Sequence, residues 1–143
     1  MARYLLDTNI VSYLVDTTSP FHQAVQSELA ALSDTDEVTL SILSLYELHH
    51  WFAYDPTQQG AVEEVIRDFT LLPLPESGAE LFGALMRDLR SSASRHDVQR
   101  SAIDCMVAVT ALKHQARLVS NDALFAQLAQ IIPSLELVSW TGR

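Results

Sequence analysis

The sequence lacks the features that mark several large classes of protein. It has one cysteine, Cys105, so no disulfide can form within the chain, which fits a reducing compartment. No apolar run approaches the roughly 20 residues that a membrane helix needs. The apolar run near the N-terminus is too short for a signal peptide. We therefore expect a cytoplasmic protein with no membrane segment.

Basic residues are also scarce. Nine Lys and Arg stand against 18 Asp and Glu, which gives a formal net charge of -9. Such a balance suits a cation binder and argues against wide contact with nucleic-acid phosphates. Four of the basic residues nevertheless fall close together, and these are Arg87, Arg90, Arg95 and Arg100. They form either a solvated face or a local basic surface, and overall charge does not decide between the two.

What the chain has in quantity is apolar residues. Of its 143 residues, 48% are hydrophobic, and no repeat or low-complexity tract interrupts them. A chain of this length has the size of one ordinary domain and buries roughly 70% of the surface that it exposes when unfolded. We therefore expect a single domain over residues 1–143.

Apolar periodicity predicts strands that alternate with helices. Strands are expected at 3–6, 38–43, 71–75, 117–120 and 135–138, with the third at an edge of the sheet because of its prolines. Helices are expected at 10–15, 20–32, 44–52, 56–69, 76–92, 102–115 and 122–128. Residues 95–100 are predicted to be a connection, and Ser44 with Glu47 has the spacing of a capping box. This order predicts a three-layer α/β/α domain with a short, mostly parallel sheet.

Acidic residues fall at comparable places along this pattern. Asp7 follows the first strand, Glu47 lies in the first turn of the helix after the second, and Asp122 follows the strand at 117–120. Asp104 lies at the start of the helix that precedes that strand. Ligands of parallel sheets bind at the carboxyl ends of the strands, where Asp7, Glu47 and Asp122 would meet. Each of Glu47, Asp104 and Asp122 could instead be a helix cap, because carboxylates accept from free N–H groups there.

Together the carboxylates would form a metal site. Several carboxylates at one place stay ionised only with a cation among them. Oxygen ligands select Mg²⁺ or Mn²⁺, and such an ion can activate water for displacement at phosphorus.

Four segments resemble the successive motifs of PIN-domain ribonucleases, with VapC-type toxins of toxin–antitoxin modules the most similar. The segments are LLDTN at 5–9, SLYEL at 44–48, DCMVAVTA at 104–111 and LVSNDALF at 118–125. The resemblance implies an endoribonuclease that cleaves RNA with Mg²⁺ or Mn²⁺. It makes Asp7, Glu47, Asp104 and Asp122 the catalytic metal ligands. It also implies a cognate antitoxin and a homodimer as partners.

The resemblance assigns supporting roles as well. Thr8 and Asn9 would form the turn that holds Asp7, and the Ser120 hydroxyl would hold a carboxylate or a metal-bound water. The cluster of arginines leads toward Asp104 and could guide RNA to the acidic site. The chain departs from the family at 94–100, where a glycine-containing loop is common and no glycine is present.

Other residues have simpler interpretations. Glu47 and His50 share a helical face and could bind a transition metal, although His50 more simply reads as a surface residue. Cys105 is expected to be a buried helix residue. Four aromatic residues, Tyr46, Trp51, Phe52 and Tyr54, exceed what one helix face can bury. Part of this cluster is expected in the core and part at a protein–protein contact.

Alternative functions remain open at this point. A haloacid-dehalogenase-type phosphatase also begins with a strand and an aspartate, but its second aspartate is here Asn9, and the only lysine, Lys113, lies deep in a predicted helix. A PIN-domain nuclease that is not a toxin, or a catalytically silent PIN fold that only binds, would share the same motifs.

Overall fold

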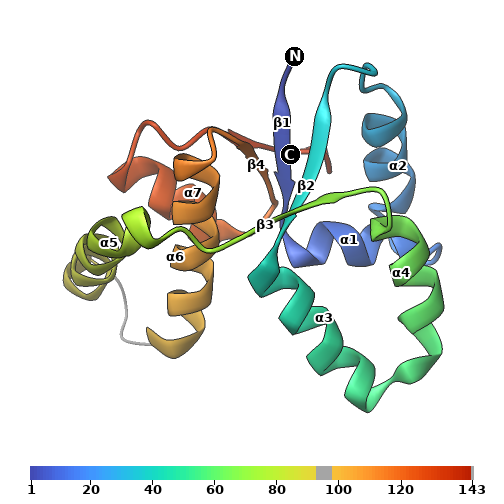
Figure 1. The fold of residues 1–143 in the computed structure, drawn as a ribbon, viewed down its shortest axis with the longest axis horizontal. Helices are drawn as coiled ribbons and strands as arrows, with labels where there is room; N and C mark the ends of the chain where they lie inside the picture. Colours follow the sequence, from blue (N-terminus) through green and yellow to red (C-terminus); the bar gives the residue numbers. More distant parts are fainter. Residues whose placement is uncertain (93–97, 143) are drawn as a thin grey trace.

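A computed structural model describes residues 1–92 and 98–142, and a parallel β-sheet runs through its centre (Figure 1). The strands are β1 (Arg3–Leu6), β2 (Glu37–Ser41), β3 (Thr70–Leu72), β4 (Arg117–Val119) and β5 (Leu137–Val138). Their order across the sheet is β3-β2-β1-β4-β5, and all four pairings are parallel. The first strand of the chain is therefore central, and β3 lies at an edge as predicted.

Helices cover both faces of this sheet and complete three layers (Figure 1). They are α1 (Thr8–Val15), α2 (His22–Ala30), α3 (Ile42–Tyr54), α4 (Gln59–Ile66), α5 (Ala79–Ser92), α6 (Val98–Lys113) and α7 (Ala123–Ile131). Short 3-10 turns at Pro56–Gln58 and Glu76–Gly78 precede α4 and α5. The three-layer α/β/α prediction is confirmed. No helix of the described residues combines the length and apolar composition needed to cross a membrane.

The two hydrophobic cores follow the alternation of side chains along the strands. Leu5 of β1 and Leu118 of β4 point to the face covered by α5, α6 and α7. Their neighbours Leu6 and Val119 point to the opposite face and pack with α1, α2, α3 and α4. Because each central strand contributes to both cores, the sheet is fixed from two sides and its carboxyl edge is a rigid support.

The register of β1 and β4 determines what lies at that edge. Leu6 pairs with Val119, so the next residues, Asp7 and Ser120, leave the sheet side by side. The backbone N–H of Asp7 donates to the carbonyl of Val119 at 3.0 Å, which extends the pairing to Asp7 itself.

The start of α3 differs from the prediction. Ser41 is the N-cap, and its hydroxyl accepts from the N–H of Leu43 at 3.1 Å. Ser44 lies inside the helix, is fully buried and has no hydrogen-bond partner among the described residues. The predicted capping box of Ser44 and Glu47 is therefore wrong, and Glu47 lies in the second turn of α3 rather than the first. The apolar pair after Ser41 suits a strand and a helix equally, which explains the error.

Both ends of α6 also differ from the prediction. The helix begins at Val98, so the connection predicted for 95–100 is wrong over residues 98–100, and Arg95 lies outside the described residues. Asp104 is consequently in the second turn of α6 and does not open it. The helix ends at Lys113, because Gln115 adopts a left-handed φ of 56°.

Candidate active site

Asp7 ends the central strand, and only 7% of its surface is exposed. It occupies the N-cap position of α1, yet its side chain makes no capping hydrogen bond. The Ser120 hydroxyl instead donates to Asp7 Oδ2 at 2.9 Å from the end of the neighbouring strand. Helix capping therefore does not account for this buried carboxylate, which is oriented by a contact across the sheet.

Ser120 also connects Asp7 to Asp122. The Ser120 Oγ accepts from the backbone N–H of Asp122 at 3.0 Å while it donates to Asp7. The Asp122 side chain accepts from the N–H of Leu124 at 2.9 Å and so caps α7. Capping is thus an established role of Asp122 in this structure, in agreement with one of the two interpretations that the sequence allows.

Glu47 is brought to the same edge by α3. The Thr8 hydroxyl donates to Glu47 Oε1 at 2.8 Å, and Thr8 directly follows Asp7 in the chain. This bond ties the second turn of α3 to the first residue of α1. Because Glu47 lies inside its helix and Ser41 is the cap, capping does not explain Glu47 either.

Asp122 and Glu47 act on Asp7 electrostatically. The pKa of Asp7 is raised from 3.8 to about 6, first because the group is buried and then because the charges of Asp122 and Glu47 disfavour a further anion. The bond from Ser120 and the Thr8 N–H oppose this rise, since both stabilise the ionised form. A cation at this edge would favour full ionisation of Asp7.

The chemistry of these donors fits a hard divalent cation. Carboxylate and hydroxyl oxygens are the ligands that Mg²⁺ and Mn²⁺ prefer, and Mg²⁺ needs only one or two protein carboxylates beside water and substrate oxygens. No group of three acidic, histidine or cysteine side chains in residues 1–92 and 98–142 is arranged to hold one ion. Joint binding by Asp7, Glu47 and Asp122 would therefore need side-chain rotation.

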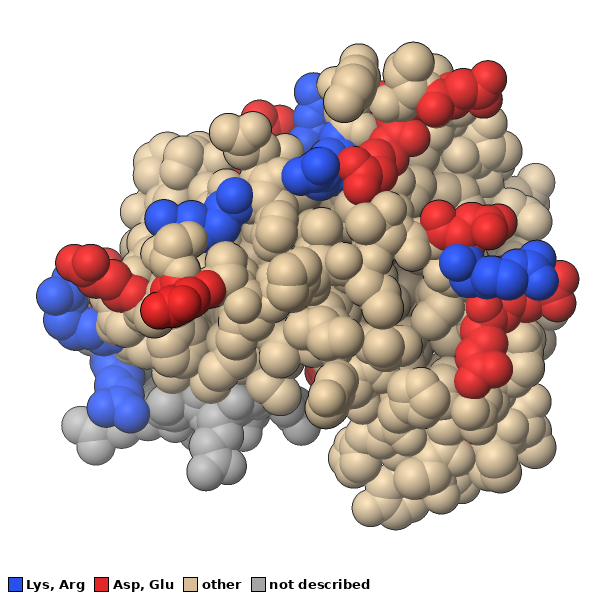
Figure 2. Space-filling view, viewed as in Figure 1, with Lys and Arg blue, Asp and Glu red and all other residues tan. Residues whose placement is uncertain are grey.

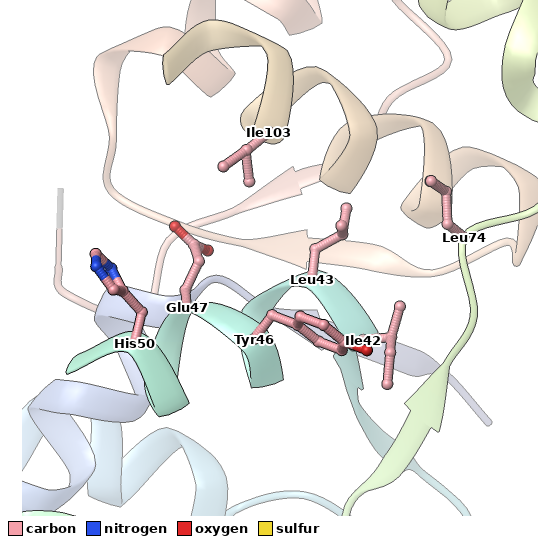
Figure 3. A pocket seen from close by; sticks show the side chains of 7 residues that line it. All are labelled: Ile42, Leu43, Tyr46, Glu47, His50, Leu74 and Ile103. Carbon is pink, nitrogen blue, oxygen red and sulfur yellow. The ribbon is translucent and has the colours of Figure 1, made fainter. Parts of the chain in front are cut away.

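Asp104 lies on α6, the helix across from Glu47. Its neighbour Ile103 and Glu47 line one pocket, where the Glu47 side chain points toward α6 (Figure 3). Burial, with the charge of Asp104 as a smaller cause, raises the pKa of the Cys105 thiol to about 11. Cys105 is buried as predicted and stays a thiol at neutral pH, so it is a poor nucleophile. The role of Asp104 as a ligand stays a prediction.

Asn9 and the four arginines are the remaining predicted site residues. Asn9 is exposed and makes no hydrogen bond with Asp7 in the described structure. Arg87 and Arg90 are exposed on α5, where Arg87 Nε lies 3.2 Å from Asp88 Oδ1. Arg95 and the side chain of Arg100 fall outside the described part of the chain. A role in RNA binding for these arginines stays a prediction.

No sequence pattern indicated the pocket beside Glu47, which Figure 3 shows from close by. Its volume is about 420 Å³. Its lining residues are Ile42, Leu43, Tyr46, Glu47, His50, Leu74 and Ile103. They come from α3, the segment after β3, and α6, which are far apart in sequence, so no local pattern predicts their meeting. Glu47 and His50 share a helical face, as their spacing predicted.

The aromatic cluster of α3 divides between core and surface, and a protein–protein contact at its exposed part stays a prediction. Phe52 is buried at 4% exposure and Trp51 packs partly against the same core. Tyr46 and Tyr54 are exposed at 73% and 81%. Tyr46 lines the pocket, whereas Tyr54 lies outside it and contacts the His50 ring edge-on.

Comparison with known proteins places the chain in a family. The sequence profile of the PIN domain matches residues 4–131. Because this match covers most of the chain, the protein belongs to the PIN-domain family. None of the curated proteins is similar enough in sequence to match.

Solved structures support the same fold. VapBC-1 from nontypeable Haemophilus influenzae aligns with a TM-score of 0.75 and 21% identity, covering 97% of this chain and 98% of that one. FitAcB from Neisseria gonorrhoeae aligns with a TM-score of 0.76 and 19% identity, covering 98% and 99%. VapBC2 from Rickettsia felis, bound to a DNA fragment from its promoter, aligns with a TM-score of 0.75 and 19% identity, covering 96% and 98%.

Proposed function

We propose that this protein is a metal-dependent endoribonuclease and the toxin of a toxin–antitoxin pair. The observation that carries the proposal is the buried carboxylate of Asp7, which the neighbouring strand orients and which lies within electrostatic reach of Glu47 and Asp122. Membership of the PIN-domain family supports nuclease chemistry, and the similar fold of proteins from VapBC and FitAcB structures supports the narrower assignment.

Asp7, Glu47, Asp104 and Asp122 would hold Mg²⁺ or Mn²⁺, directly or through water. When bound, such an ion lowers the pKa of water and stabilises the negative charge that develops on the phosphodiester. The protein supplies the positioning. Ser120 keeps Asp7 turned toward the edge of the sheet, and Thr8 keeps Glu47 beside it. No protein nucleophile is needed, which agrees with the protonated state of Cys105.

Cleavage assays test the reaction. Purified protein without a partner should cut RNA with Mg²⁺ or Mn²⁺ and not with EDTA. Asp7→Asn and Glu47→Gln should each lose activity by about 100-fold or more, because removing a charged ligand should cost at least the roughly 10- to 100-fold that removing a supporting residue costs. Asp34→Asn is the matched control, since Asp34 is exposed and remote from the site. Equal activity in EDTA contradicts the mechanism.

The partner is tested separately. The compared structures are complexes such as VapBC-1 and FitAcB, which supports a cognate antitoxin for this chain. Expression of the chain alone should stop growth, and co-expression of a small protein encoded next to it should restore growth. A normal growth rate without such a neighbour favours a PIN-domain nuclease that is not a toxin. We also propose that the free protein is a homodimer. Its mass in solution tests this proposal.

A further inference from the structure

The chemistry proposed above uses one residue of the pocket, Glu47, and leaves the rest of its walls without a role. It opens to solvent between α3 and α6, and Tyr46, Leu74 and Ile103 are exposed at its walls. Exposed apolar side chains gathered around a hollow mark binding sites more often than chance surface. The volume of about 420 Å³ falls within the range of about 300–1,000 Å³ that small-molecule and cofactor sites occupy.

The walls of the pocket select an uncharged group. Glu47 is the only charged residue of α3, and Figure 2 shows a broad surface with few charged side chains in this region. Apart from Glu47 and His50, the lining consists of aliphatic side chains and the Tyr46 ring (Figure 3). A nucleobase matches these walls, because it is flat, uncharged and able to stack on an aromatic ring.

The position of Glu47 favours a nucleobase over a second copy of this protein as the occupant of the pocket. Glu47 forms part of the pocket wall and is bonded to Thr8, the residue after Asp7. A protein that filled the pocket would cover Glu47 and obstruct the approach of a phosphate to the acidic edge. A base in the pocket would instead bring its own phosphate toward that edge. The few basic residues of the chain also leave affinity to be supplied by contacts other than phosphate pairing.

We infer that this pocket binds an unpaired nucleobase of the RNA substrate and that Tyr46 is the stacking surface that positions it. The inference rests on the proposed ribonuclease function. The base must be unpaired, because a base within a duplex is not free to enter a pocket. The inference also makes Tyr46 a positioning residue, one position before a candidate metal ligand.

Binding is best measured in an Asp7→Asn parent, which cannot cleave the probe. The probes are a degenerate pool of short single-stranded RNA and a ribose-phosphate strand of the same length without bases, both in Mg²⁺. Adding Tyr46→Leu should weaken binding of the RNA pool by about 5- to 150-fold, the factor expected for one stacked base. Tyr46→Phe should retain binding. Tyr54→Leu is the matched control, because Tyr54 is as exposed on the same helix but outside the pocket.

The expected result includes equal binding of the strand without bases by the Tyr46→Leu variant and its parent. An unchanged affinity of Tyr46→Leu for the RNA pool overturns the inference while wild-type cleavage leaves the ribonuclease proposal intact. If Tyr46→Leu lowers the mass of the assembly in solution and leaves the RNA affinity unchanged, the pocket is instead a contact between copies of the protein. An Asp7→Asn parent that binds no RNA, together with a wild type that cuts none, overturns both proposals.

Discussion

At the scale of single residues, the buried Asp7 carboxylate destabilises the folded protein when it is ionised. The carboxylate is buried next to two other acids, and its pKa of about 6 means that the folded protein takes up a proton more readily than the unfolded chain. The contribution of Asp7 to the free energy of unfolding is therefore fully present below about pH 4 and is lost as the pH rises through 6. A shift of this size corresponds to about 3 kcal/mol at neutral pH.

Asp7→Asn should consequently stabilise the metal-free protein at neutral pH, by at most about 3 kcal/mol, because the amide keeps the shape without the charge. The advantage should shrink toward pH 4, where the wild-type carboxylate is protonated in the folded state. Urea unfolding in EDTA at a series of pH values measures it. Asp34→Asn should show no such trend, and a pH-independent difference for Asp7→Asn would argue against a raised pKa.

Asp122 has a structural role that must be separated from a catalytic one. Asn is as good an N-cap as Asp, so Asp122→Asn should leave the free energy of unfolding within about 0.5 kcal/mol, whereas Asp122→Ala should lower it by about 1 kcal/mol. If Asp122 is also a metal ligand, both variants should lose RNA cleavage. Full cleavage by Asp122→Asn would mean that Asp122 acts only as a helix cap.

At the scale of elements, the two serines near the start of α3 differ in kind. Ser41→Ala removes the bond to the Leu43 N–H and should destabilise the protein by about 1 kcal/mol. Ser44→Ala should be neutral or slightly stabilising, because the buried Ser44 hydroxyl lacks a partner in the described residues. Thermal or urea unfolding of the two variants provides the comparison. The opposite ranking would mean that Ser44 is the true cap.

These serines also show the limits of what the sequence predicts. The alternation of strands and helices was predictable because apolar spacing reflects burial directly. The burial of Leu5 in one core and of Leu6 in the other follows from it. The end of β2 was not predictable, since Ile42 and Leu43 suit a strand or a helix. Their assignment depends on packing against other elements, which no local pattern contains.

The site was predictable in part for the same reason. Parallel strands imply that Asp7 and Asp122 approach one edge, but only the strand order puts β4 beside β1 and lets Ser120 reach Asp7. The bond from Thr8 to Glu47 needs the angle between α1 and α3, and the pocket needs α6 as its far wall. Contacts between distant elements are set by tertiary packing, so the sequence proposes candidate residues but not how they touch.

At the scale of the whole molecule, the net charge of -9 complicates any test with metal ions. Cations screen the repulsion among surface carboxylates of any acidic protein, so salt alone can stabilise the fold. A specific site adds a second effect, because an ion that binds only the folded state stabilises it by an amount that grows with its concentration. The two effects separate when ionic strength is held constant.

We therefore expect millimolar Mg²⁺ or Mn²⁺ to raise the melting temperature above that in NaCl of equal ionic strength. An ion at about 100 times its dissociation constant contributes about 2.7 kcal/mol. Asp7→Asn should lose most of this rise, although it is more stable without metal, because the buried charge that the ion compensates is gone. Asp34→Asn removes one charge from the surface and should keep the rise. Equal rises in both variants would show screening of the whole surface instead of a site at the end of β1.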